Sequence, residues 1–125
     1  MTENELSKEI IGAAIEVHRH LGPGLLESAY EEALCCELDL REIKYERQKR
    51  QELKYKGKQL KTDYRIDLLV ENKVIVENKA KEEVTPRDRA QTLTYLRLGN
   101  FKLALIINYH ESMLKDGISR IVNNL

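Results

Sequence analysis

The sequence predicts an α/β fold in which a central mixed β-sheet is flanked by helices. Two segments with apolar residues at helical spacing come first, several strands follow, and one helix then stands between two strongly apolar strands. A helix in that place can carry the chain to a parallel strand of the same sheet, as a right-handed crossover. The expected order is therefore α-α-β-β-β-β-α-β-α, with all 125 residues in a single domain.

Two helices are expected at the start of the chain. The first covers about residues 3–20, and the sequence Gly22-Pro23-Gly24 ends it. The second covers about residues 26–42 and contains the neighbouring residues Cys35 and Cys36. Adjacent cysteines on a helix point in different directions and rarely form a disulfide, so both are expected to be reduced.

Four strands are expected next. Two basic strands, about residues 45–49 and 51–55, lead into a turn at Lys56-Gly57. Two apolar strands, residues 64–70 and 74–80, are separated by a short polar segment, which predicts a β-hairpin.

The last part of the chain predicts a helix, a strand and a second helix. Thr85 can cap the first of these helices, Pro86 suits its first position, and Gly99-Asn100 ends it. Residues 101–109 form a continuous apolar run, which is typical of a strand buried on both faces. A short final helix is expected over about residues 114–122.

The predicted hairpin places two carboxylates opposite each other. With Glu71-Asn72-Lys73 as the loop, Asp67 opposes Glu77 with Cβ atoms roughly 5 Å apart. Lys79 points to the same face as Glu77, because strand side chains alternate. A like-charged pair is destabilising by itself, and Lys79 supplies only one compensating charge. The pattern therefore indicates a divalent cation held by oxygen ligands.

These three residues suit metal-assisted hydrolysis of phosphodiester bonds. Carboxylates can hold Mg²⁺ or Mn²⁺, which polarises a phosphate and lowers the pKa of a bound water. Lys79 can orient that water and offset charge that develops on the phosphate. An ordinary salt bridge on an exposed hairpin explains the same residues, because the pattern is short and its residue types are common.

Two further motifs carry polar residues that can reach the same place. Glu27 lies in the first turn of a helix, where it is either favoured by the helix dipole or available as a third metal ligand. Tyr30, one turn later, either hydrogen-bonds to Glu27 or packs in the core. Gln91 and Tyr95 form an i, i+4 pair that either supports the metal ligands or packs on the sheet.

Together these motifs resemble a known family. The segment Gly24-Leu25-Leu26-Glu27-Ser28-Ala29-Tyr30 is similar to the G-x-x-E-x-x-Y signature of the GxxExxY proteins, a family of the PD-(D/E)XK nuclease superfamily. The resemblance extends from about Ile10 to Ile118. The order of the acidic motifs, the E-x-K triplet and Q-x-x-x-Y also resembles that of RecB-type nuclease domains.

The resemblance implies a restriction-endonuclease-like core and a divalent-metal-dependent nuclease acting on DNA. The implied ligands of Mg²⁺ or Mn²⁺ are Glu27, Asp67, Glu77 and the backbone carbonyl of Asn78. The implied catalytic residues are Asp67, Glu77 and Lys79, with Tyr30, Gln91 and Tyr95 in support. Asn78 departs from the family, which usually has an apolar residue there, and its side chain is expected to point to the opposite face of the sheet.

The chain has no net charge, since 21 Lys and Arg residues balance 21 Asp and Glu residues, but basic residues gather in one segment. They are expected to guide a nucleic-acid backbone, although lysines that protect an edge strand explain the same pattern. These residues are Lys44, Arg47, Lys49, Arg50, Lys54, Lys56, Lys58 and Lys61.

Two other functions stay open at this level. One is a catalytically inactive domain of the same fold that binds nucleic acid or a protein, and the other is a domain that a metal merely stabilises. No apolar run approaches the roughly 20 residues that span a bilayer, and the N-terminus lacks the apolar stretch of a signal peptide, so a cytoplasmic protein without membrane association is expected. A homodimer is also expected, because a domain of this size offers little area to grip a duplex.

Overall fold

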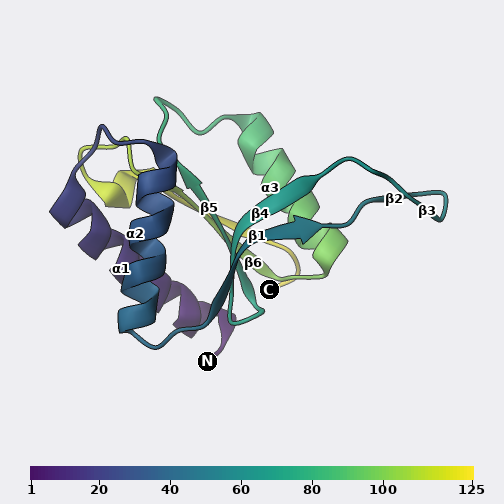
Figure 1. Cartoon of the computed structure of the whole chain (residues 1–125), viewed down its shortest axis with the longest axis horizontal. Helices are drawn as coiled ribbons and strands as arrows, with labels where there is room; N and C mark the ends of the chain where they lie inside the picture. The colour runs from purple at the N-terminus through teal and green to yellow at the C-terminus, as the bar shows by residue number, and fades with distance from the viewer.

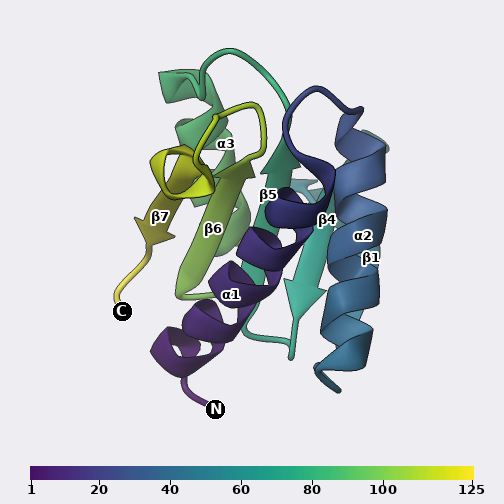
Figure 2. The same cartoon turned by 90° about the vertical axis from the view of Figure 1, so that its left-hand side faces the viewer.

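The computed structural model describes residues 1–125 and contains a five-stranded mixed sheet between two helical layers (Figure 1). The strand order is β1-β4-β5-β6-β7. Two helices, α1 and α2, cover one face of this sheet, and α3 covers the other face (Figure 2). The predicted fold class, a central mixed sheet flanked by helices, is confirmed.

The helices are α1 (Glu3–Leu21), α2 (Glu27–Leu40) and α3 (Pro86–Gly99). The strands of the main sheet are β1 (Tyr45–Gln51), β4 (Tyr64–Val70), β5 (Val74–Lys79), β6 (Leu103–Asn108) and β7 (Ile118–Val122). A separate small hairpin is formed by β2 (Lys54–Tyr55) and β3 (Lys58–Gln59), and a short 3-10 helix, η1 (Leu114–Gly117), precedes β7. None of the helices is long and apolar enough to cross a membrane.

Helix α3 is the predicted crossover between two parallel strands, β5 and β6. The Thr85 hydroxyl accepts the Asp88 N–H at 3.2 Å, and the Asp88 carboxylate accepts the Thr85 N–H at 2.9 Å. This reciprocal capping box satisfies two donors that the first turn of a helix leaves free. At the other end, Asn100 adopts the left-handed conformation with φ 57°, as its position after Gly99 predicts.

Apolar cores lie on both faces of the sheet. The larger core is packed beneath α1 and α2 and includes Leu68, Val76 and Tyr109. The smaller core lies beneath α3 and includes Ile75 and Tyr95. Because β6 lies inside the sheet and both of its faces are covered, all of its residues are buried, as its continuous apolar sequence predicts.

The two predicted basic strands, residues 45–49 and 51–55, are replaced by one longer strand and a small hairpin. Strand β1 continues through Arg50 and Gln51, because both residues still pair with β4. The predicted turn at Lys56-Gly57 exists, but it joins β2 to β3. This β2–β3 hairpin projects beyond the edge of the main sheet in Figure 1.

The predicted final helix, residues 114–122, is wrong. Only η1 is helical, and Ile118–Val122 forms strand β7 against β6. β-branched residues favour a strand here, and the pairing satisfies backbone groups on the outer side of β6. The turn into β7 requires glycine, because a Cβ atom at Gly117 would lie 2.2 Å from the carbonyl oxygen of Asn108.

The capping box of α3 should contribute measurably to stability. We expect Thr85→Ala to lower the free energy of unfolding by about 1 kcal/mol, because the Asp88 N–H loses its acceptor at the start of the helix. Urea denaturation followed by circular dichroism measures the change. The matched control is Thr94→Ala in the exposed middle of α3, where we expect a change within about 0.5 kcal/mol. Equal effects of the two substitutions would contradict the role of the cap.

Candidate functional site

The ladder between β4 and β5 stops where the candidate site begins. Its last pair is Leu68 opposite Val76. Beyond that pair, the Asn78 N–H donates to the Asp67 carboxylate at 2.8 Å, so a side chain takes the place of the next strand as hydrogen-bond acceptor. The register of the hairpin is the predicted one, and Asp67 lies close enough to Glu77 for each carboxyl to influence the other.

Glu77 is a buried acid with an unsatisfied oxygen atom. It is only 5% exposed, and its Oε1 atom has no hydrogen-bond partner. Burial, and then the negative charge of Asp67, raise the pKa of Glu77 to about 9. Burial also raises the pKa of Asp67, although the hydrogen bond from the Asn78 N–H acts in the opposite direction. A bound cation would stabilise the charged form of both carboxyl groups.

Glu27 reaches the same region from the first turn of α2. It lines a pocket of about 390 Å³ together with Asp67, Glu31 and Gln48. Burial raises the pKa of Glu27, the charge of Lys79 opposes this change, and the charge of Asp67 adds to it. The helix and the hairpin therefore bring Glu27, Asp67 and Lys79 to one place on the molecule.

Lys79 is the last residue of β5, and the backbone that follows it is held by Asn108. The Asn108 side chain donates to the Lys81 carbonyl at 2.8 Å and accepts the Lys81 N–H at 3.1 Å. The positive charge of Lys79 lowers the pKa of Glu77 and of Asp67. Lys79 thus partly offsets the carboxylate repulsion, as its position in the sequence predicts.

The side chain of Asn78 points away from these charges, as predicted. Its Oδ1 atom accepts a hydrogen bond from the Tyr109 hydroxyl at 3.1 Å inside the larger core, and its Nδ2 atom has no partner. Tyr30 lies in the same core, with its ring stacked on Tyr109 at 4.4 Å between centroids.

Tyr30 supports the site through the loop before α2, not through Glu27. Its hydroxyl donates to the Gly22 carbonyl and accepts the Leu25 N–H at 3.1 Å. The sequence allows Tyr30 either to hydrogen-bond to Glu27 or to pack in the core, and in the structure it packs in the core. The hydroxyl fixes the turn that leads into the helix carrying Glu27.

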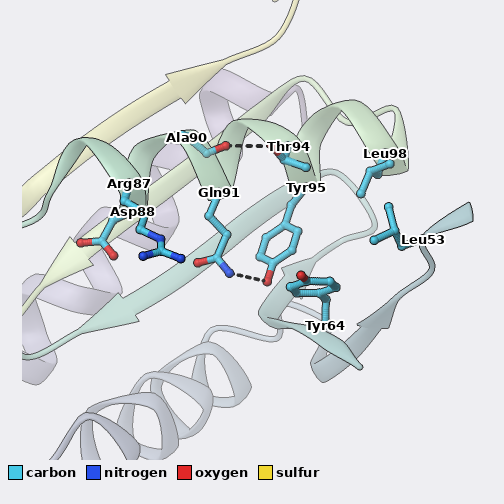
Figure 3. A pocket seen from close by; sticks show the side chains of 9 residues that line it. All are labelled: Leu53, Tyr64, Arg87, Asp88, Ala90, Gln91, Thr94, Tyr95 and Leu98. Carbon is cyan, nitrogen blue, oxygen red and sulfur yellow. Dashed lines mark hydrogen bonds between the residues drawn. The ribbon is translucent and has the colours of Figure 1, made fainter. Parts of the chain in front are cut away.

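Gln91 and Tyr95 face the sheet from α3 (Figure 3). The Gln91 amide donates to the Tyr95 hydroxyl at 3.2 Å, so the predicted i, i+4 pair is formed. Burial, and then the charge of Glu77, raise the pKa of Tyr95 to about 12. The pair therefore lies on the α3 side of the carboxylates, whereas Glu27 approaches from the α2 side.

Glu31 and Gln48 lie near Asp67, but neither belongs to the sequence motifs described above. The buried Glu31 carboxylate accepts hydrogen bonds from Arg47 Nε at 2.6 Å and from Gln48 Nε2 at 3.0 Å. Gln48 Nε2 also lies 3.5 Å from Asp67 Oδ1. The resulting chain of contacts, from Arg47 through Glu31 and Gln48 to Asp67, orients the Asp67 carboxylate.

The backbone of β1 explains why Gln48 reaches the site. Gln48 has φ 54°, in the left-handed region, and it is skipped in the otherwise regular pairing of β1 with β4. This conformation is uncommon for a residue with a side chain, and nothing in the sequence indicates it. The spacing of Glu31 four residues after Glu27 on one helical face is the only available sign of its role.

The structure separates the predicted basic stripe into parts with different surroundings. Lys44 lies at the other end of β1, where its N–H donates to Glu71. Arg47 forms an ion pair with the buried Glu31 carboxylate. Lys49 and Arg50 pair with exposed carboxylates, at 3.0 Å to Glu46 and 3.8 Å to Asp63. The exposed basic residues on or beside the β2–β3 hairpin are Lys54, Lys56, Lys58 and Lys61.

The donor atoms of these side chains suit a divalent cation. In their present arrangement, however, they do not form a complete metal site. No group of three or more acidic, histidine or cysteine side chains is close enough together to hold a metal ion as it stands. The available donors are carboxylate oxygens, which Mg²⁺ and Mn²⁺ prefer. The buried Oε1 atom of Glu77, which has no hydrogen-bond partner, is an unused oxygen donor of this kind.

Comparison with known proteins identifies the superfamily of the chain. A family model described as the PD-(D/E)XK nuclease superfamily matches residues 4–121, which is nearly the whole chain. No curated protein and no solved structure matches the chain. The chain belongs to the PD-(D/E)XK nuclease superfamily. Its α/β sheet is consistent with a restriction-endonuclease-like fold, and membership supports a nuclease-like function on a nucleic-acid substrate.

The raised pKa of Glu77 should make the metal-free protein less stable in alkali. Folded Glu77 keeps its proton up to about pH 9, whereas the group ordinarily loses it near 4.5, so between these values the folded state binds more protons. Stability is then highest below the lower value and falls as the pH rises through the window. In a metal chelator, we expect a loss on the order of a few kcal/mol from about pH 5 to about pH 9, measured by urea denaturation.

The variant Glu77→Gln should flatten this pH dependence, because the amide cannot titrate. The exposed Glu82→Gln is the matched control and should keep the slope of the unmodified protein. A slope that persists in Glu77→Gln would show that another group is responsible.

Proposed function

We propose that this protein is a Mg²⁺- or Mn²⁺-dependent nuclease of the GxxExxY family that hydrolyses phosphodiester bonds of DNA. The observation that carries the proposal is the buried Glu77 carboxyl, with an unpaired oxygen atom, beside Asp67. Glu27, from α2, and Lys79, from the end of β5, are close enough to Asp67 for their charges to interact with it. Superfamily membership favours hydrolysis over a catalytically inactive binding domain.

Each residue has a separate task in this mechanism. Asp67 and Glu77 would bind the ion, with Glu27 and the Asn78 carbonyl completing its protein ligands. A bound divalent ion polarises the phosphate and lowers the pKa of a coordinated water. Lys79 orients the attacking water and offsets negative charge on the phosphate.

The surrounding residues keep these groups in place. Gln48 holds Asp67 on one side, and the Asn78 N–H holds it on the other. Tyr95, fixed by Gln91, lies close enough to Glu77 for the charge of that carboxyl to raise the Tyr95 pKa. Such fixed neighbours are what a reaction that depends on exact positioning requires.

The β2–β3 hairpin is the part best suited to contact the substrate backbone. Its exposed lysines can pair with phosphates, whereas most basic residues of β1 already have acidic partners. Within this proposal the substrate is DNA rather than RNA. The enzyme acts in the cytoplasm, as a homodimer that enlarges the surface available to a duplex.

Removing the charge of Glu77 or Lys79 should abolish the reaction. We expect Glu77→Gln and Lys79→Ala each to reduce metal-dependent cleavage of labelled DNA by at least about 100-fold, since each group acts on the reacting phosphate. Glu82→Gln and Lys73→Ala are matched controls from exposed positions and should cleave normally. Cleavage that survives both substitutions at the site would remove the assignment.

A substitution at Lys79 should remove catalysis without removing metal binding. We expect Mn²⁺ to raise the melting temperature of the unmodified protein, because a ligand that binds only the folded state stabilises it. Asp67→Asn should lose this rise together with cleavage. Lys79→Ala should keep the rise while losing cleavage, because the lysine is not a ligand. Calorimetry and a cleavage assay on the same samples test this, and a domain that metal only stabilises would show the rise without any cleavage.

A further inference from the structure

A second pocket lies on the α3 side of the sheet (Figure 3). Its volume is about 430 Å³, and it shares no residue with the pocket that contains Glu27 and Asp67. Tyr64 comes from β4, Gln91 and Tyr95 come from α3, and Leu53 comes from the segment between β1 and β2.

The walls of this pocket are aromatic and apolar. The rings of Tyr64 and Tyr95 meet edge to face, with centroids 6.3 Å apart and an interplanar angle of 65°. Tyr95 is buried and bonded to Gln91, whereas Tyr64 is only partly buried and lines the cavity. Leu53 faces Leu98 at the far end of the pocket (Figure 3). A flat ligand with apolar faces suits such walls.

Two polar side chains of the pocket, Gln91 and Arg87, keep groups that are free to bind a ligand. Gln91 uses one N–H on Tyr95, which leaves its carbonyl oxygen and second N–H. Arg87 has no carboxylate partner within salt-bridge distance. The neighbouring Asp88 pairs with Lys81 instead, at 2.7 Å. A free guanidinium is well suited to a phosphate.

The position of the pocket links it to the reacting groups. Tyr95 packs in the smaller core with Ile75, which lies two residues before Glu77 on the same face of β5. At the other end, Leu98 also lines an adjoining pocket with Lys49, Arg50 and Lys54. The pocket therefore has the Glu77 carboxyl near its Tyr95 wall and basic residues beyond Leu98.

We propose that the pocket binds one unpaired nucleotide of the substrate strand, with its base against Tyr64, its polar edge at Gln91 and its phosphate at Arg87. This inference rests on the proposed nuclease function and narrows the substrate to single-stranded or locally unpaired DNA. A base inside an intact duplex must leave its stack before it can enter, which has a free-energy cost. Single strands, flaps and frayed ends avoid that cost.

Binding without cleavage tests the pocket directly. Fluorescence anisotropy in a metal chelator compares a short single strand with the same backbone carrying no bases. Stacking of one base on an aromatic ring corresponds to about 5- to 150-fold in affinity, or ~1–3 kcal/mol. We expect the normal strand to bind at least about fivefold more tightly than the baseless strand. Equal affinities would overturn the proposal.

Variants assign that difference to the pocket. Tyr64→Leu keeps an apolar side chain and should remove most of the preference for bases, whereas Tyr64→Phe keeps the ring and should retain it. Arg87→Gln should weaken binding of both strands and reduce its salt dependence. A full preference for bases in Tyr64→Leu, or an unchanged salt dependence in Arg87→Gln, would contradict the assigned contacts.

A parallel cleavage assay in Mn²⁺ separates this inference from the proposed function. An active enzyme that binds both strands equally well would overturn the pocket and leave the nuclease in place. A protein that never cleaves but prefers strands with bases, through Tyr64, would overturn the nuclease and support the pocket. We expect an active enzyme that cleaves single strands faster than blunt duplex.

Discussion

The hydrogen bond from the Asn78 N–H to the Asp67 carboxylate is the contact on which the candidate site depends. It ends the β4–β5 ladder and holds Asp67 beside the buried Glu77. Asp67 lies in the middle of β4, at the point where the pairing of β4 with β5 stops. Glu27 from α2 and Lys79 from β5 can act together with Asp67 only because this hydrogen bond fixes the Asp67 carboxylate beside Glu77.

The residues of the candidate site destabilise the folded protein. The buried carboxyl group of Glu77 lies beside the partly buried carboxyl group of Asp67, and the Glu77 Oε1 atom has no hydrogen-bond partner. An apolar core lies on each side of this defect, beneath α1 and α2 and beneath α3. Local rules are most often broken where a protein has a function, and this part of the molecule breaks them most clearly.

Much of this arrangement could be predicted because it depends on local sequence. Strand alternation and a three-residue loop are enough to place Asp67 near Glu77, and Thr85 and Asn100 mark both ends of α3. Strand β7 could not be predicted, because a short apolar segment suits a helix as well as a strand until its partner β6 is known. The pairing of Arg47 with Glu31 and the left-handed Gln48 depend on how α2 packs on β1, so they appear only in three dimensions.

The β2–β3 hairpin is attached in a way that makes it exchangeable. A backbone hydrogen bond from Leu60 to Leu53, at 2.8 Å, closes its base, and none of its residues belongs to either core. Segments of different length or charge could therefore be grafted onto this base while the carboxylates stay where they are. The length and charge of the hairpin can therefore vary among related proteins while the residues of the candidate site stay the same.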